Sequence, residues 1–275
     1  MDESSTRKLI LKKYSLPLIL FASVALRILA AFILGNQVIE FPGTYDQISY
    51  HQLALRVLSG NGFSFGEDWW PLTEAGAPTA HWSYLYTYYL VIVYKLFGSS
   101  VLMARLIQAV LVGIFHPYLV FLLGRSVFNR RVGLLAAGLT SVYAYFIYYA
   151  ATLMTEPFYI TGILLALCLT IRIGNQTQRS LERQARKQRL WQYCLLGITL
   201  GMTLLLRQLF LLVVPILFLY LLWRQRKRAL FGILVASILI ILMILPFSLY
   251  NYDRFDQFVL LNTNAGFAFF WANHP

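Results

Sequence analysis

The chain has 275 residues, of which 59% are hydrophobic and only 12% are charged. An ordinary soluble domain is about 45 to 50% apolar and about 25% charged, so this composition excludes a water-soluble globular enzyme and indicates a multi-pass membrane protein. The net charge of +12 would suggest nucleic-acid binding in a soluble protein, but here it must first be tested against loop orientation. Cys168 and Cys194 lie in apolar runs and form neither a disulfide framework nor a zinc motif.

Seven segments are long and apolar enough to be membrane-spanning helices. About 20 mostly apolar residues are needed, because no backbone amide can remain unpaired in the hydrocarbon. The first segment follows a basic N-terminus and exceeds the length of a signal-peptide core, so we expect it to be retained. The fifth and sixth segments are short and share a turn at Arg207. The expected spans are 16–35, 101–123, 132–151, 156–173, 191–207, 208–223 and 229–249.

The distribution of basic residues predicts the orientation of these spans. With the N-terminus inside, 17 of the 23 Lys and Arg residues fall on the inner side, as the positive-inside rule requires. The net charge is therefore mainly an orientation signal, and nucleic acid is not an expected partner. We expect one transmembrane module over 1–275, with its C-terminus outside. Its larger connections are an outer loop at 36–100, a basic cytoplasmic loop at 174–190 and an outer C-terminal segment at 250–275.

The first outer loop, 36–100, is too long for a simple connection, so function is expected there. Apolar residues at helical spacing over 45–58 predict a surface helix that begins beside Asp46. Residues 67–78 combine acids with Trp, Pro and Gly, which is typical of a loop. Residues 81–98 are apolar and rich in Tyr. If this segment crossed the membrane every later basic cluster would change sides, so we expect an interfacial helix.

Two acidic residues at the outer ends of helices are candidate catalytic groups, because lipid-facing helices have no need of ionisable side chains. Asp46 could accept a proton from an acceptor as a general base, or it could simply cap the helix that follows. Glu156 lies in Thr155-Glu156-Pro157, where helix-start preferences explain an acid without any function. The same placement would direct its carboxylate toward Asp46.

Three arginines are candidate ligands for a phosphate at the outer side of the membrane. Arg207 lies at the turn between two spans, where it either reaches a phosphate with its planar fork or extends to the membrane surface. Arg27 lies deep in the first span, so we expect a buried partner, either an outer carboxylate or a phosphate. Arg105 is equally consistent with an interfacial anchor and a ligand contact.

The four histidines, His51, His81, His116 and His274, have no metal-ligand spacing. No cofactor is predicted, and a divalent metal has no support from the sequence. A Gly-rich phosphate loop and a Ser-centred nucleophile motif are also absent from the sequence, so a nucleotide substrate on the inner face is unsupported.

Taken together, the motifs of the chain resemble the GT-C membrane glycosyltransferases related to the dolichyl-phosphate-mannose protein mannosyltransferases and the aminoarabinose transferases (glycosyltransferase family 39-like). The resemblance covers nearly the whole chain. It is carried by Arg27, Asp46 with Tyr50, the Gly-Asn-Gly-Phe turn at 60–63, the Tyr run at 84–89 before Lys-Leu-Phe-Gly at 95–98, Ala-Arg-Leu at 104–106, the segment 124–131, Thr-Glu-Pro at 155–157, Arg207 after Gly201, and the closing segment 251–275.

This resemblance implies transfer of a hexosyl or pentosyl group from a polyprenyl-phosphate donor at the outer or periplasmic face, usually with inversion. It makes Asp46 the central catalytic group and Glu156 the acidic position before proline, where other members carry Asp. We expect Arg207, Arg27 or Arg105 to bind the donor phosphate. Tyr50, His81 and Trp82 are expected to bind substrate.

The resemblance also suggests the setting of the protein and what lies outside the present chain. Family members are commonly longer, so a further C-terminal region is expected to be missing. We expect an integral protein of the plasma (bacterial inner) membrane, in contact with membrane lipids. The acceptor could be a lipid, a glycan or a protein. The main alternative is a transporter or lipid flippase without transferase activity, although the sequence shows no paired inverted halves. A noncatalytic binding subunit is a second alternative.

Overall fold

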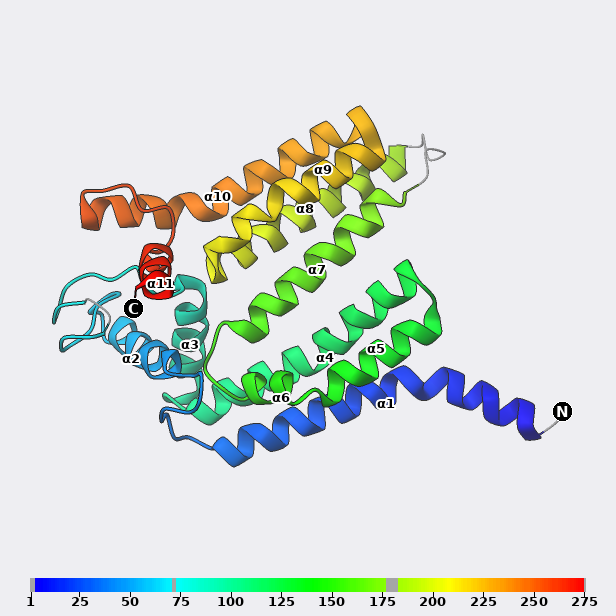
Figure 1. Ribbon diagram of the computed structural model, residues 1–275, viewed down its shortest axis with the longest axis horizontal. Helices are drawn as coiled ribbons and strands as arrows, with labels where there is room; N and C mark the ends of the chain where they lie inside the picture. Colours follow the sequence, from blue (N-terminus) through cyan, green and yellow to red (C-terminus); the bar gives the residue numbers. More distant parts are fainter. Residues whose placement is uncertain (1–2, 71–72, 177–182, 275) are drawn as a thin grey trace.

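A computed structural model describes residues 3–70, 73–176 and 183–274, and this part of the chain is helical apart from turns, loops and two isolated β-bridges (Figure 1). The expectation of an all-α membrane fold is thus confirmed. The helices are α1 (Glu3–Leu34), α2 (Asp46–Leu58), α3 (Tyr84–Phe97), α4 (Val101–Val127), α5 (Arg130–Val142), α6 (Ala144–Ala150), α7 (Glu156–Gly174), α8 (Arg183–Leu206), η1 (Gln208–Leu212), α9 (Val214–Gln225), η2 (Arg226–Arg228), α10 (Ala229–Phe255) and α11 (Asn264–Asn273).

Five stretches of the described chain are long and apolar enough to cross a membrane, or six if the bent pair α5 and α6 forms one span. The last stretch, Gln208–Phe255, contains both α9 and α10. Figure 1 shows these two helices running in opposite directions, so the chain reverses at η2. The total of seven spans stays a prediction. The five stretches are Tyr14–Leu34, Val101–Val127, Glu156–Gly174, Arg189–Leu206 and Gln208–Phe255.

The two ends of the helical bundle differ in character. Figure 1 shows the start of α1, the α4–α5 connection and the α9–α10 connection at one end, where three of the predicted basic clusters are found. The opposite end carries α2, α3 and α11. These three basic clusters therefore lie at the same end of the bundle, as the charge pattern of the sequence predicts. Which end faces the cytoplasm stays a prediction.

The third predicted span, 132–151, is not one continuous helix. It breaks at Tyr143, whose backbone is extended, and α5 and α6 meet at an angle of 56°. The break leaves carbonyl groups at the end of α5 without their helical partners. Arg27, which is fully buried, donates to the carbonyl oxygens of Thr140 and Ser141, each at 3.1 Å. Its other partner is Ser23, whose carbonyl and hydroxyl oxygens also accept from the guanidinium. Arg27 forms no ion pair with a carboxylate of the described residues, and a role in phosphate binding stays a prediction.

Arg105 serves a second helix end in the same way. Its guanidinium donates to the carbonyls of Leu34 and Gly35, at 3.0 and 2.7 Å, where α1 ends. A further bond of 3.2 Å reaches the side chain of Gln47 on α2. A cation at a helix C-terminus also interacts favourably with the helix dipole. Arg27 and Arg105, both fully buried, thus satisfy backbone acceptors at two helix ends.

A buried cluster of aromatic and aliphatic residues attaches α2 and α3 to the bundle. It joins Tyr50 and Leu53 of α2 to Tyr86 of α3, and it includes Leu153 and Leu206, which adjoin the start of α7 and the end of α8. Burial of apolar surface fixes α2 over these two helix ends, at about 25 cal/mol per Å² removed from water. The predicted surface helix beside Asp46 is confirmed as α2, and the loop at 67–78 contains no helix in its described part.

Candidate functional site

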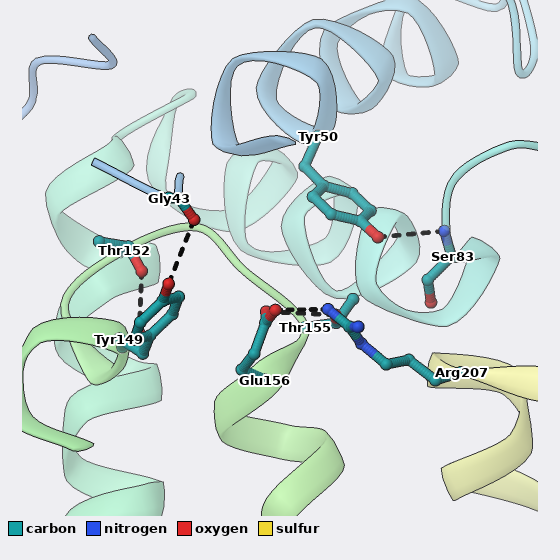
Figure 2. Close-up of polar contacts among 8 residues, drawn as sticks. All are labelled: Gly43, Tyr50, Ser83, Tyr149, Thr152, Thr155, Glu156 and Arg207. Carbon is teal, nitrogen blue, oxygen red and sulfur yellow. Dashed lines mark hydrogen bonds and ion pairs between the residues drawn. The ribbon is translucent and has the colours of Figure 1, made fainter. Parts of the chain in front are cut away.

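The centre of the candidate site is an ion pair between Glu156, the first residue of α7, and Arg207, the residue after α8. Arg207 has an extended backbone that ends α8, as the predicted turn required. Its guanidinium reaches across to the Glu156 carboxylate (Figure 2). The Glu156 side chain is 19% exposed and the Arg207 side chain 42%, so the cation remains accessible to a ligand while it is held in place.

Thr155 and Tyr159 complete the surroundings of Arg207. The Arg207 Nε group donates to Thr155 Oγ1 at 3.2 Å, and the guanidinium carbon lies 5.8 Å from the centre of the Tyr159 ring, a distance that allows a cation–π interaction. Sequence reasoning missed Tyr159. Its position three residues after Glu156 places both on one face of α7, which is the signal that could have revealed it.

Asp46 is a half-buried carboxylate on the first residue of α2. The N-cap is Tyr45, so Asp46 is not itself the cap that the alternative interpretation suggested. Burial raises the pKa of Asp46 above its ordinary value of 3.8, while the neighbouring Trp82 indole and the positive charge of Arg207 oppose this rise. The Trp82 Nε1 group is buried and makes no hydrogen bond of regular geometry with the described residues. It still lies close enough to Asp46 to favour the ionised form of that carboxylate.

Tyr50 lies one helical turn after Asp46 and points from α2 toward the ion pair (Figure 2). Its hydroxyl oxygen accepts a hydrogen bond of 3.2 Å from the Ser83 amide. Burial raises the pKa of Tyr50, as do the negative charges of Asp46 and Glu156, while Arg207 lowers it. Asp46, Glu156 and Arg207 therefore all act electrostatically on this one phenol, which remains protonated.

The structure separates the remaining predicted residues. His81 packs on Trp82, with ring centres 4.6 Å apart, and so lies beside the site. Arg27 and Arg105 are bonded to helix ends as described above, and a role in phosphate binding for either stays a prediction. Within the described ranges there is no group of three or more His, Cys, Asp or Glu residues that could hold a metal ion.

An apolar groove approaches the ion pair from within the bundle. Its volume is about 460 Å³, and it lies between α3, α4, α7 and α8. Phe158 and Leu206 form part of its wall, and they adjoin Glu156 and Arg207 in the chain. The groove thus ends close to the only ion pair recorded among the described residues. An elongated apolar molecule with an anionic end fits this combination of an apolar groove and an accessible cation.

Comparison with known proteins identifies the family. Residues 83–250, more than half of the chain, match the profile of the dolichyl-phosphate-mannose-protein mannosyltransferases. The chain belongs to this family, so the resemblance noted in the sequence is confirmed. The matched region includes Glu156 and Arg207. A search of curated protein sequences returns no match.

Solved structures with a similar fold include the oligosaccharyltransferase of Archaeoglobus fulgidus. Its apo form gives a TM-score of 0.73 at 20% identity, over 91% of this chain and 31% of that enzyme. The same enzyme tethered with an acceptor peptide gives a TM-score of 0.71 at 18% identity, over 92% and 32% of the two chains. AglB of the same organism, in complex with an inhibitory peptide and a dolichol-phosphate, gives 0.69 at 18% identity, over 92% and 31%.

At these identities the likeness shows a shared GT-C fold. The present chain spans about a third of the length of the A. fulgidus enzyme. The matched part covers nearly all of the present chain, whose helices carry the ion pair and the apolar groove.

Proposed function

We propose that the protein transfers a hexosyl or pentosyl group from a polyprenyl-phosphate donor to an acceptor at the outer face of a bacterial inner membrane, with inversion at the anomeric carbon. One observation carries this proposal. A half-buried carboxylate, Asp46, lies within the electrostatic influence of an accessible guanidinium, Arg207, and Leu206, the residue before that arginine, lines an apolar groove. Family membership and the dolichol-phosphate seen with AglB support a lipid-linked donor.

The donor would bind with its phosphate at Arg207 and its prenyl chain in the groove. A guanidinium fork holds two phosphate oxygens at once, which stabilises the negative charge that forms as the phosphate leaves. Glu156 and Thr155 hold the guanidinium. The groove wall is almost entirely apolar, so it matches an isoprenoid chain in chemistry as well as in its position beside the cation.

Asp46 would act as the general base. In the reaction an acceptor O–H or N–H loses its proton to Asp46, its lone pair forms the new bond to the anomeric carbon, and the bond from that carbon to the phosphate oxygen breaks. The phosphate retains the electron pair, so it needs a cation and no proton. Glu156 is engaged by Arg207, which leaves Asp46 as the unpaired carboxylate, and a single base supports inversion without a covalent intermediate.

Replacement of Asp46 by Asn tests this assignment. Asn keeps the size of the side chain but cannot take a proton. The rate of sugar release from a radiolabelled polyprenyl-phosphate donor should therefore fall by about 10² to 10⁴, while donor affinity in a filter-binding assay stays within about twofold. The matched control is Asp256→Asn, an exposed residue after α10, which should keep full activity. Wild-type turnover in Asp46→Asn would exclude this carboxylate as the base.

A further inference from the structure

A second cavity lies between residues 73–81 of the first loop, Phe255 at the end of α10 and the C-terminal helix α11. Its volume is about 710 Å³, within the range of about 300 to 1,000 Å³ that small-molecule sites occupy. A backbone bond of 3.1 Å from Thr263 to the Ala80 carbonyl ties its two walls together. It shares no lining residue with the apolar groove, so the molecule has separate spaces for two ligands.

The lining of this cavity has a definite chemistry. The lining includes three threonines and four aromatic residues, namely Trp70, Phe255, Phe267 and Phe270. Trp70 and Phe267 meet edge to face, with ring centres 5.2 Å apart, and Trp70 remains 55% exposed. Aromatic faces pack on the C–H faces of a sugar ring, while hydroxyl groups pair with its polar edge.

The charge of the described lining residues indicates that the ligand of this cavity differs from the lipid phosphate. None of the described residues that line the cavity is Asp, Glu, Lys or Arg. His81 lines it too, and burial lowers the pKa of its imidazole below 6.5, so the ring is neutral at pH 7. A binding site for a phosphate or a carboxylate would place a cation here. The cavity therefore favours an uncharged ligand.

The position of the cavity connects it with the catalytic carboxylate. His81 lies against Trp82, the indole that influences Asp46. From the other side, the Trp70 ring contacts Tyr45, with centres 6.1 Å apart, and Tyr45 directly precedes Asp46. Tyr45 and Trp82 thus connect this cavity with Asp46, whereas the wall of the apolar groove includes Phe158 and Leu206, which adjoin Glu156 and Arg207 in the chain.

From these observations we infer that the cavity is the acceptor site and that the acceptor is a neutral saccharide, whose ring stacks on Trp70 and Phe267 and whose hydroxyl is deprotonated by Asp46. The inference rests on the proposed function, because it identifies the acceptor class for the same reaction. It makes α11 a wall of the active site.

Direct binding of saccharides tests the inference without turnover. The full 275-residue chain in lipid nanodiscs is exposed to three probes, namely a neutral hexose tetrasaccharide, a matched tetrasaccharide with uronic acids and a Ser/Thr-containing peptide. Binding is followed by saturation-transfer NMR. We expect the neutral saccharide to bind and the other two to bind at least tenfold more weakly. Absence of neutral-saccharide binding, or preference for the peptide or the acidic saccharide, overturns the inference.

Variants locate the binding. Trp70→Ala should weaken neutral-saccharide binding about tenfold by loss of a stacked ring, and Trp70→Phe should restore most of it. Phe267→Ala provides a second, independent variant. Trp191→Ala, an exposed indole on α8, is the matched control and should bind normally. If Trp70→Ala and Phe267→Ala both bind as the wild type does, the saccharide lies elsewhere and the inference fails.

Donor binding separates this result from the proposed function. The same Trp70 and Phe267 variants should retain wild-type affinity for polyprenyl phosphate, and Arg207→Ala should lose that affinity while keeping the saccharide. If the wild type binds the saccharide at Trp70 but does not bind polyprenyl phosphate, the donor assignment is wrong and the saccharide site stands. Loss of donor affinity in Trp70→Ala would mean that the cavity is not a separate acceptor site.

Discussion

Arg207 and Thr155 share a hydrogen bond of 3.2 Å between the guanidinium Nε group and the threonine hydroxyl. Thr155 occupies the N-cap of α7, yet its side chain caps no backbone amide of that helix. Loss of a capping bond costs a helix about 1 kcal/mol. The hydroxyl is therefore committed to the side chains of Arg207 and Glu156, which is the arrangement expected where orientation of a cation matters more than helix stability.

Replacement of Arg207 should weaken donor binding more than it slows the chemical step. Arg207→Ala removes a charge-assisted contact with phosphate worth roughly 1.5 to 3 kcal/mol, so the Kd for polyprenyl phosphate should rise about 10- to 150-fold. Arg207→Lys should recover only part of this loss, since an ammonium cannot form a two-pronged contact. Lys95→Ala, an exposed cation on α3, is the control. Unchanged donor affinity in Arg207→Ala would leave the arginine a purely structural partner of Glu156.

Glu156 should act through Arg207 and not on the proton of the acceptor. Glu156→Gln keeps a hydrogen-bond acceptor beside the guanidinium but removes the charge, so we expect a moderate rise in donor KM, about tenfold, and a smaller loss of kcat than in Asp46→Asn. Steady-state kinetics with the donor varied will measure both parameters. Equal losses of kcat in Glu156→Gln and Asp46→Asn would instead indicate that the two carboxylates work as a pair.

The pH dependence of transfer should report the ionisation of Asp46. Only the ionised carboxylate can accept a proton, so the rate falls as pH drops through the pKa of Asp46, which burial raises above 3.8. Arg207 lowers this pKa, so Arg207→Ala should move the acidic limb of kcat to higher pH. The Lys95→Ala control should leave the limb in place. A limb unmoved by loss of Arg207 would show that another group titrates.

Arg27 should prove structural. Arg27→Ala would leave the carbonyls of Thr140 and Ser141 without their donor, at a cost of about 1 to 3 kcal/mol each. We expect a lower thermal midpoint in detergent, measured by intrinsic fluorescence, with the donor KM of the remaining folded protein unchanged. If the Arg27→Ala protein were stable but bound the donor poorly, Arg27 would be a phosphate ligand, as its depth in the first span suggested.

The orientation of the bundle can be tested by labelling single cysteines with an impermeant reagent. In a background with Cys168 and Cys194 replaced, Glu74→Cys and Phe269→Cys should react from outside the cell, since both residues are exposed at the end with the outer loop. Lys227→Cys, in the basic turn η2, should react only after the membrane is opened. The reverse pattern would invert the assignment of inside and outside.

Hydropathy and charge were sufficient to predict much of this fold. Runs of apolar residues fix where spans lie, and the helix at Asp46 follows from its apolar spacing. The break at Tyr143 could not be predicted, because neither proline nor glycine marks it and the arginine that bonds to the carbonyls beside it comes from a distant helix. The helix α11 was also not predicted. Its ten residues are too few for the length criteria that identified the spans.

In the candidate site, too, some features follow from the local sequence and others depend on the tertiary fold. A charge in an apolar segment signals a buried partner, but the sequence does not say which carbonyls the tertiary fold leaves unpaired. The sequence therefore left Arg27 and Arg105 as alternatives to Arg207 for the phosphate ligand. In the structure two of them serve helix ends and only Arg207 faces an acid. Tyr159 was missed because its role depends on the position of α8 relative to α7.

The connection between α1 and α2 illustrates how the fold fixes the residues that precede Asp46. Arg105 holds its beginning at Leu34 and Gly35, and the hydroxyls of Tyr148 and Tyr149 on α6 donate to the Pro42 and Gly43 carbonyls, at 3.0 and 3.2 Å.

These contacts immobilise the segment that leads to Asp46 before any substrate arrives. The conformational entropy of the segment is then lost during folding, so ordering it adds nothing to the activation free energy of the reaction. Fixed geometry contributes most to rate in the transition state. Under the proposed function the bent pair α5 and α6 would act as a template, because α6 fixes the segment that positions Asp46 for the acceptor.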